Sequence, residues 1–313
     1  MKAALVLFTF LTAVPVFAQQ ARRTIAVTID DLPVVSTRRD LKNRREITKK
    51  LLAHIKKEKI PAIGFVNENK LYNGDEQDPQ QIDLLRSWID SGLELGNHTY
   101  SHRSLNVIPL AEYENDLLKG EAITKRLLAA KGKKIRYFRH PYLQTGMSTE
   151  VKSSFGEFLK QHGYTVAPIT FDNADYIFSR AYDNAFDRRD LAQMRKVGDA
   201  YVPYMEKKLE YWERQSVKLL GREVSQTLLI HANFINSHYL DDLAAMFRKR
   251  DYRIVSLDEA LRDEAYQRAD TFTGRAGISW LHRWALAEGR KNVLAGEPTV
   301  PEFVLKLSGF DSE

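Results

Sequence analysis

Two short segments of this 313-residue chain carry residue types that bind metal ions and move protons. Asp30 and Asp31 follow an apolar run, and His98 and His102 lie four positions apart. This spacing puts both imidazoles on one side of a helical turn, and one aspartate completes a His₂-carboxylate set with coordination positions left open. The second aspartate is then placed to take a proton from an attacking water. The pattern favours hydrolysis over a purely structural site.

Neither segment is specific by itself. Histidines four apart often share a solvated helix face, and aspartates are common in turns and at helix N-caps. The order and spacing of further motifs strengthen the prediction. The motifs are TIDD at 28–31, HTYSH at 98–102, RHPY at 139–142, DNADY at 172–176 and LLIH at 228–231. With them the chain resembles the polysaccharide deacetylases, also called the NodB-homology or carbohydrate esterase 4 family, over most of its length beyond residue 18.

The resemblance implies one divalent metal ion, held by Asp31, His98 and His102, with Asp30 as the general base. Zinc is the expected metal, although cobalt, nickel and iron also suit a His₂-carboxylate set. A metal with a carboxylate beside it is the arrangement expected of a hydrolase.

The later motifs supply the other expected site residues. By resemblance, Arg139 orients Asp30 and keeps it charged, a role that suits a guanidinium better than an ammonium. The backbone N–H of Tyr142 is expected to stabilise an oxyanion. His231 is expected to act as the general acid, with Asp175 orienting its imidazole. Taken without the family, the same residues also fit a surface arginine and a histidine packed at a strand end.

Two positions depart from the family pattern. The family usually has tryptophan where this chain has Tyr176, and often a second one where this chain has Ile169. These aromatics line the groove near the acetyl group and the sugar. The departures leave the expected metal ligands and acid–base pair intact, but they weaken any transfer of substrate identity from familiar members.

Short apolar runs alternate with helical patterns along the chain. The expected strands are 24–29, 62–66, 93–96, 135–138, 164–169, 226–230 and 253–255, and the expected helices between them are 41–59, 79–91, 109–130 and 149–162. This alternation implies a parallel sheet covered by helices, with the motifs at the carboxyl ends of strands, where α/β barrels carry their chemistry. Alternation alone also fits an open sheet. The resemblance implies an α/β fold with a distorted, incomplete (β/α)₇ barrel of parallel strands and outer helices.

A long segment at about 177–225 separates the last two motifs. Apolar side chains recur at three- and four-residue steps from Met194 to Trp212, which predicts an amphipathic helix. Pro203 should kink this helix or split it in two. We expect it to pack on the barrel, and its ends are candidates for shaping the substrate groove.

The chain is expected to contain a barrel over 19–266, including that insertion, and a C-terminal helical extension over 267–313. The extension contains the sequence GISWLHRWALAEG, in which His282 is expected to be structural. The residues expected to face the core are Trp280, Leu281, Trp284 and Leu286.

Residues 1–18 have the pattern of a signal peptide, with Lys2, an apolar run and Val16-Phe17-Ala18, so cleavage is expected after Ala18. The run is short and interrupted by polar residues, which disfavours a membrane anchor. The protein is therefore expected in the periplasm or outside the cell. It has no cysteine, which excludes disulfides and thiol catalysis. The formal charge of +6 comes from scattered basic residues, so nucleic acid is not an expected partner.

Together these expectations predict an exported, metal-dependent hydrolase that removes the acetyl group from N-acetylhexosamine units of a glycan. One alternative is an O-acetyl ester hydrolase with the same machinery, and another is a glycan-binding protein that kept the fold without activity. Loss of Asp30, a metal ligand or His231 would favour the latter, and all are present. Peptidoglycan, a chitin-like oligomer and an exopolysaccharide are all open as the acetylated partner.

Overall fold

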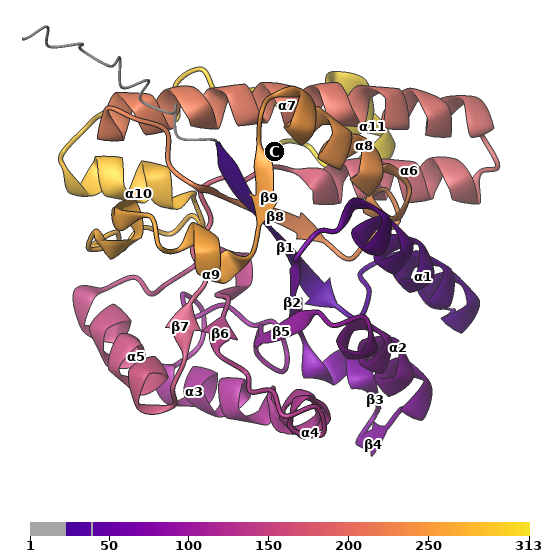
Figure 1. Cartoon of the computed structure of the whole chain (residues 1–313), viewed down its shortest axis with the longest axis horizontal. Helices are drawn as coiled ribbons and strands as arrows, with labels where there is room; N and C mark the ends of the chain where they lie inside the picture. Colours follow the sequence, from indigo (N-terminus) through magenta and orange to yellow (C-terminus); the bar gives the residue numbers. More distant parts are fainter. Residues whose placement is uncertain (1–22, 39) are drawn as a thin grey trace, which may run out of the picture.

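A parallel sheet forms the centre of the molecule (Figure 1). The computed structural model describes residues 23–38 and 40–313, so the expected signal peptide lies outside the described residues. The seven strands of the sheet are β1 (Thr24–Leu32), β2 (Ile63–Val66), β5 (Glu94–Asn97), β6 (Tyr137–Phe138), β7 (Thr165–Val166), β8 (Gln226–His231) and β9 (Arg253–Val255). Their order is β7-β6-β5-β2-β1-β8, with β9 also paired to β1, and every pairing is parallel.

Strand β1 is the central element of the sheet. All of its residues except Thr24 and Asp31 are buried, as expected for a parallel strand covered on both faces. Its register with β8 runs from Ile25 opposite Gln226 to Asp30 opposite His231. The pairing therefore places an acidic side chain and an imidazole beside each other at the carboxyl ends of two neighbouring strands.

The sheet curls into an incomplete barrel. The chain beyond β7 reaches the other edge of the sheet, where Phe171 forms an isolated parallel bridge with Leu228. The N–H of Phe171 donates to the carbonyl of Thr227 at 3.0 Å, and the N–H of Leu229 donates to the carbonyl of Phe171 at 3.2 Å. This isolated bridge takes the place of a continuous ladder of hydrogen bonds between this segment and β8. The expectation of an incomplete (β/α) barrel is confirmed.

Helices surround the sheet (Figure 1). Apart from the helices of the long insertion, those between successive strands of the sheet are α1 (Leu41–Glu58), α2 (Pro79–Asp90), α3 (Leu110–Lys119), α4 (Ala122–Ala129), α5 (Thr149–Gln161) and α8 (Asn236–Lys249). The expected single helix over 109–130 is therefore wrong, because the chain breaks between α3 and α4. A Cβ on Gly120 would lie 2.5 Å from the backbone of Thr99 and Tyr100. Glycine at the break thus lets the loop that carries the two histidines approach closely.

The insertion consists of α6 (Asp175–Asp187) and α7 (Leu191–Leu220). Of the two outcomes expected at Pro203, a split of the helix is wrong, because α7 is continuous through this residue, and a kink stays a prediction. Tyr201, Met205 and Trp212 are fully buried on α7, which packs against α6, α8 and α10 (Trp280–Ala287). Buried side chains recur along α7 from Val197 to Leu219, and their burial offsets the roughly 3 kcal/mol that an interior proline costs a helix.

The C-terminal extension contains α10 and α11 (Glu302–Ser308), and α11 packs on α6. Trp280, Leu281 and Trp284 are buried as expected, but Leu286 is 37% exposed, so its assignment to the core is wrong. The remaining short elements are η1 (Glu68–Leu71), β3 (Tyr72–Asn73), β4 (Glu76–Gln77), η2 (Pro141–Leu143), α9 (Leu257–Ala260) and η3 (Glu264–Gln267).

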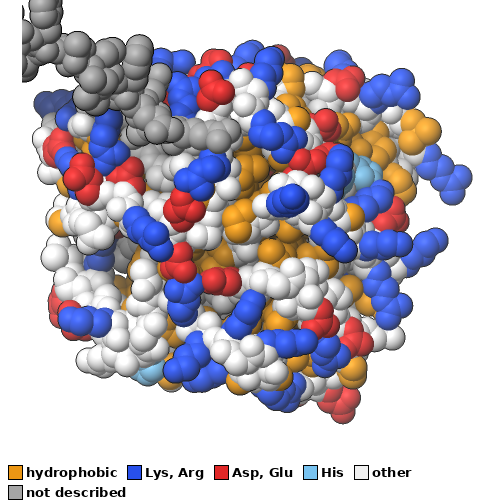
Figure 2. All heavy atoms as spheres, in the orientation of Figure 1, with side chains coloured by type: hydrophobic (Ala, Val, Ile, Leu, Met, Phe, Trp, Pro, Cys, Tyr) orange, Lys and Arg blue, Asp and Glu red, His pale blue; other side chains and the backbone are white. Residues whose placement is uncertain are grey.

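The surface is of mixed charge. Figure 2 shows Lys and Arg side chains intermixed with Asp and Glu side chains over the face drawn, in agreement with the scattered basic residues of the sequence. Among the described residues, no helix combines the length and the apolar character that crossing a bilayer requires.

Candidate active site

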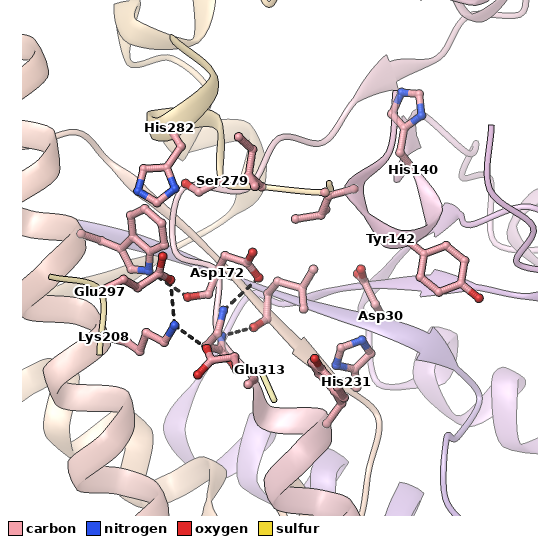
Figure 3. Close-up of a pocket in the computed structure, with 18 of the residues that line it drawn as sticks. Asp30, His140, Tyr142, Asp172, Lys208, His231, Ser279, His282, Glu297 and Glu313 are labelled. Atoms are coloured by element: carbon pink, nitrogen blue, oxygen red, sulfur yellow. Dashed lines mark hydrogen bonds and ion pairs between the residues drawn. The ribbon is translucent and has the colours of Figure 1, made fainter. Parts of the chain in front are cut away.

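Residues from all five motifs line one cavity of about 910 Å³ at the carboxyl ends of the strands (Figure 3), whereas Arg139 and Asp175 are fully buried and do not line it. Asp30 and Asp31 come from the end of β1, and His231 comes from the end of β8. His98 and His102 follow β5 and line the same space. A cavity of this size is within the range that holds a small molecule or part of a polymer.

Asp31, His98 and His102 form a group with ligand atoms within 4.8 Å of one another. His102 Nε2 lies 3.5 Å from Asp31 Oδ1, and His98 Nε2 lies 3.9 Å from the same oxygen. Asp31 Oδ1 is buried and has no hydrogen-bond donor among the described residues, and the nearest cationic group is Lys70 Nζ at 3.5 Å. Because a buried carboxylate oxygen without a donor is costly, a cation at this point would satisfy it.

The two histidines converge through a loop and not through a helix, so the expected helical turn is wrong. Thr99 and His102 both have left-handed backbone angles, with φ of 64° and 56°. The N–H of His102 donates to Thr99 Oγ1 at 3.0 Å, and the N–H of Thr99 donates to Asn97 Oδ1 at 2.7 Å. These contacts hold the imidazole centroids 4.8 Å apart.

The protonation of this group suits a metal. His98 Nδ1 lies 2.8 Å from the carbonyl oxygen of Arg139, so Nδ1 carries the proton and Nε2 keeps its lone pair. Nε2 lies 3.7 Å from Asp30 Oδ2 and 3.9 Å from Asp31 Oδ1. Burial lowers the pKa of both His98 and His102, which keeps them neutral. Burial alone would raise the pKa of Asp31, but Lys70 and His102 hold it below its usual range. One anionic oxygen with two neutral imidazoles fits a divalent cation such as zinc.

Asp30 lies beside this group and contacts Arg139, which is fully buried. Arg139 Nη1 is 3.5 Å from Asp30 Oδ2, and its Nη2 donates to Thr28 Oγ1 at 2.9 Å. Burial raises the pKa of Asp30 to about 6, an effect that the charge of Arg139 partly offsets. The arginine thus acts on Asp30 through its charge and one long contact, and Asp30 Oδ1 has no donor among the described residues.

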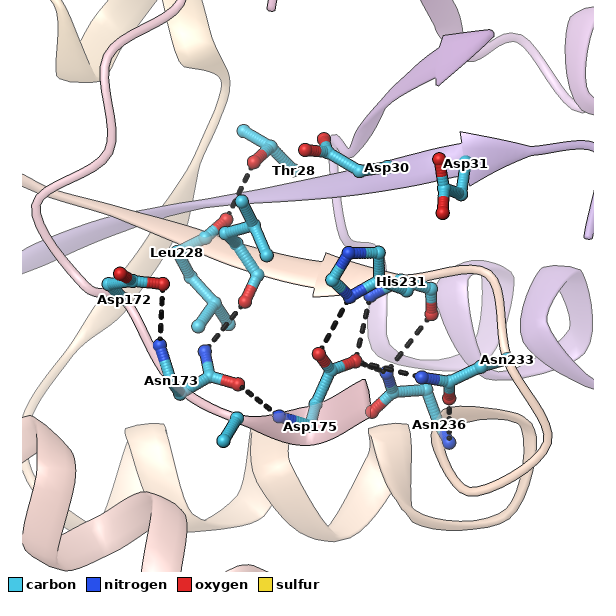
Figure 4. Close-up of polar contacts among 12 residues, drawn as sticks. Thr28, Asp30, Asp31, Asp172, Asn173, Asp175, Leu228, His231, Asn233 and Asn236 are labelled. Carbon is cyan, nitrogen blue, oxygen red and sulfur yellow. Dashed lines mark hydrogen bonds and ion pairs between the residues drawn. The ribbon is translucent and has the colours of Figure 1, made fainter. Parts of the chain in front are cut away.

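The partly exposed imidazole of His231 pairs with the fully buried carboxylate of Asp175 (Figure 4). His231 Nδ1 donates to Asp175 Oδ1 at 2.7 Å, which directs Nε2 away from the carboxylate. Burial alone would lower the pKa of His231, but the charge and hydrogen bond of Asp175 raise it to about 9. The imidazole therefore holds a proton at neutral pH.

Three residues of this network were not predicted from the sequence. Asn233 Nδ2 and Asn236 Nδ2 donate to Asp175 Oδ2 at 2.9 and 2.7 Å. Tyr201 on α7 donates its hydroxyl hydrogen to Asn236 Oδ1 at 2.7 Å. The only feature of the sequence that could have indicated Asn233 and Asn236 as site residues is their position shortly after the LLIH motif at 228–231. Tyr201 and Asn236 are 35 positions apart in the sequence, so no local sequence pattern indicates their hydrogen bond.

Tyr142 lies on the cavity wall with φ 56° and ψ 16°, a left-handed conformation that is uncommon for an aromatic residue. Its side chain is 58% exposed and its ring lies 4.5 Å from that of His102. A Cβ on Gly277 would lie 1.6 Å from the Tyr142 carbonyl oxygen, so the C-terminal extension packs directly against this backbone. Tyr142 is therefore held by the contact of its ring with His102 and by the contact of its carbonyl oxygen with Gly277. Strained backbone of this kind is common at functional sites.

Comparisons with known proteins match part of the chain to a protein family. A family model described as polysaccharide deacetylase matches residues 18–167. A curated relative, a peptidoglycan-N-acetylglucosamine deacetylase of Bacillus cereus, is 32% identical over 118 residues, which are 38% of this chain and 36% of the relative. The match thus spans about a third of the length of that relative.

Two solved structures share the fold. A polysaccharide deacetylase from Bacillus cereus aligns with a TM-score of 0.52 and 16% identity over 75% of this chain and 92% of its own. A mutant of a carbohydrate esterase family 4 pseudoenzyme from Bacillus anthracis aligns with a TM-score of 0.52 and 16% identity over 77% of this chain and 68% of its own. Asp175 and His231 lie beyond the family match, so their place in the site depends on the structure described above.

Proposed function

Because the chain belongs to the polysaccharide deacetylase family, we propose that it is a metal-dependent hydrolase that releases acetate from N-acetylhexosamine units of a glycan. The observation that carries this proposal is the convergence of two sets of groups in one cavity. The first set is the metal-ligand group of Asp31, His98 and His102. The second set is the base Asp30 and the acid His231, which lie opposite each other in the β1–β8 register.

The metal would be held by Asp31, His98 and His102, and when bound it would supply Lewis acidity to the acyl carbonyl and to the attacking water. The protein residues around it carry the proton transfers. Asp30 accepts a proton from the water, for which its unpartnered Oδ1 is available. Arg139, whose Nη1 lies 3.5 Å from Asp30 Oδ2, stabilises the charged form of Asp30.

His231 donates its proton from Nε2 to the leaving nitrogen as the carbon–nitrogen bond breaks. Asp175 keeps the other ring nitrogen protonated and fixes the orientation of the ring. A nitrogen leaving group is poor unless it is protonated, whereas an alcohol leaving group depends on protonation less strongly. A histidine that is held protonated by a buried carboxylate therefore supports amide hydrolysis over ester hydrolysis.

Acetate release from defined glycans tests this proposal. The zinc-loaded protein is incubated with N-acetylated chito-oligosaccharides, peptidoglycan fragments and acetylated xylan, with Asp30→Asn as the control. We expect acetate from N-acetylated glycans and almost none from the variant. Release from acetylated xylan alone would instead assign the protein as an ester hydrolase. Metal binding without acetate release from any substrate would contradict a catalytic function.

Export is also proposed, from the signal-peptide pattern of residues 1–18. An exported enzyme would meet envelope or extracellular glycans as its partners. Sequencing the N-terminus of the protein recovered from the periplasm or medium should find Gln19 first. Uncut protein beginning at Met1 in a membrane fraction would contradict cleavage.

A further inference from the structure

The cavity extends beyond the catalytic groups to an inner end formed by α7 and the C-terminal extension (Figure 3). Lys208 comes from α7, Glu297 from the segment after α10, and Glu313 from the segment after α11. Asp172 lines the same cavity. None of these residues lies within residues 18–167, the segment matched by the family model. The inner end is therefore built from parts of the chain that the family match does not include.

The lysine of the inner end is not available to a ligand. Its side chain is 2% exposed, and its Nζ lies 2.7 Å from Glu297 Oε1 and 2.5 Å from Glu313 Oε1. Glu313 is also fully engaged, because its Oε2 accepts the N–H of Val300 at 2.9 Å and its Oε1 accepts the hydroxyl of Tyr204 at 2.9 Å. Lys208 and Glu313 thus anchor the extension to α7.

Two carboxylates of the inner end keep free acceptor capacity. The Glu297 side chain is 24% exposed, and its Oε2 has no hydrogen-bond donor among the described residues. Asp172 Oδ1 accepts the N–H of Asn173 at 2.9 Å, and its Oδ2 has no donor among the same residues. Burial raises the pKa of Asp172 to about 7 even though Lys208 is near. The inner end contains one lysine, Lys208, and the carboxylates of Asp172, Glu297 and Glu313, so it carries excess negative charge.

From this geometry we infer that the inner end is a subsite for the sugar unit next to the one that is deacetylated, and that it favours a unit with a free amino group. The inference rests on the proposed function. An ammonium group donates to the free oxygens of Glu297 and Asp172 and neutralises their excess charge. An N-acetyl group offers no charge there, and an anionic unit would face carboxylates in a partly desolvated site.

The preferred ligand defines a place in a reaction sequence. A free amine on a hexosamine unit is the product of N-deacetylation, so the favoured substrate is a glycan that has already lost an acetyl group at the neighbouring unit. The reaction class that supplies it is a prior deacetylation, by this enzyme or by another.

Direct binding tests the subsite without turnover. The probe is the fully deacetylated glucosamine disaccharide, titrated calorimetrically into the zinc-loaded protein. We expect Glu297→Gln to weaken binding roughly tenfold, the size of one charge-assisted hydrogen bond, and Asp172→Asn to weaken it in the same direction. The matched control is Glu302→Gln on α11, where the carboxylate is 80% exposed and pairs, in the part of the chain that the structure describes, only with Lys306 of the same helix. Equal binding by wild type and both variants, or equal weakening in the control, would overturn the subsite.

Kinetics on two matched trisaccharides provide the second measurement. One carries a free amine next to the reacting acetamide, and the other carries acetamides throughout. We expect kcat/KM to be roughly tenfold higher for the first with wild type and to become nearly equal for the two with Glu297→Gln. A wild-type enzyme without this preference would contradict the inference. Disaccharide binding that depends on Glu297, together with no acetate release from any glycan, would overturn the proposed function and leave the subsite standing.

Discussion

Asp175 contacts His231 at two points, through Oδ1 to the ring Nδ1 at 2.7 Å and through Oδ2 to the backbone N–H at 2.9 Å. The first contact holds a proton on Nδ1, the ring nitrogen that faces Asp175, and directs Nε2 away from the carboxylate. The second ties the start of α6 to the end of β8, so the carboxylate cannot rotate without losing both bonds. Four donors converge on this one buried carboxylate when the amides of Asn233 and Asn236 are included.

The first prediction concerns the pH dependence that this pair produces. His231 acts as an acid only while protonated, so activity is present below its pKa and lost as the pH rises through it. Asp175→Asn removes the charge that raises this pKa to about 9, while burial continues to lower it. We expect the alkaline limb of the kcat/KM profile to move to lower pH, with metal content unchanged.

A double-mutant cycle provides the control for that prediction. Because Asp175 acts through His231, combining Asp175→Asn with His231→Ala should cost little more than His231→Ala alone. His231→Ala should also slow amide hydrolysis more than hydrolysis of activated esters. Fully additive losses, or equal losses on both substrate types, would show that His231 is not the acid.

The second prediction concerns the metal. Wild-type protein should bind about one zinc ion per chain, and His98→Ala/His102→Ala should lose both the zinc and the activity. Metal content after dialysis, measured by atomic spectroscopy, reports the first effect directly. His162→Ala is the matched control, since His162, the C-cap of α5, is exposed and its imidazole contacts only Phe158 among the described residues. Full zinc occupancy in the double variant would refute the assignment of the ligands.

The third prediction separates the two neighbouring aspartates. Asp30→Asn should retain zinc and lose about 10² to 10⁴ of its turnover, the usual contribution of a general base. Asp31→Asn should lose zinc, because Asp31 and not Asp30 belongs to the group with His98 and His102. Metal loss in Asp30→Asn with metal retention in Asp31→Asn would mean that the two roles are reversed.

The fourth prediction uses the contact between Gly277 and Tyr142. A Cβ at Gly277 would lie 1.6 Å from the Tyr142 carbonyl oxygen, so Gly277→Ala must displace this segment of the cavity wall. Because small displacements of positioning groups are costly in catalysis, we expect turnover to fall by about 10² with zinc still bound.

Gly156→Ala is the control for that substitution. Gly156 lies within α5 with nothing within 4 Å of its added Cβ, so alanine should raise stability by about 0.5–1 kcal/mol and leave turnover unchanged. Thermal unfolding of both variants separates the local effect from a general loss of the fold. Unchanged turnover in Gly277→Ala would show that the Tyr142 backbone takes no part in catalysis.

Much of the fold and of the site could be predicted from the sequence. The alternating runs indicated the parallel strands because burial on both faces demands near-continuous apolar residues, as in β1. Asp30 and His231 lie at the ends of strands, so a correct strand assignment also places them at one edge of the sheet. Asp31, His98 and His102 were recognisable because metal binding restricts residue type more strongly than packing does.

Contacts between distant segments decided the rest. The loop conformation of His98 and His102 depends on Gly120, whose missing side chain admits the backbone of Thr99. Continuity of α7 through Pro203 depends on burial against three other helices. At the inner end of the cavity, Lys208 pairs with Glu297, which is 89 positions away in the sequence. Helical periodicity and local motifs carry no information on such pairs, because the free energy that forms them comes from packing and charge pairing in the folded chain.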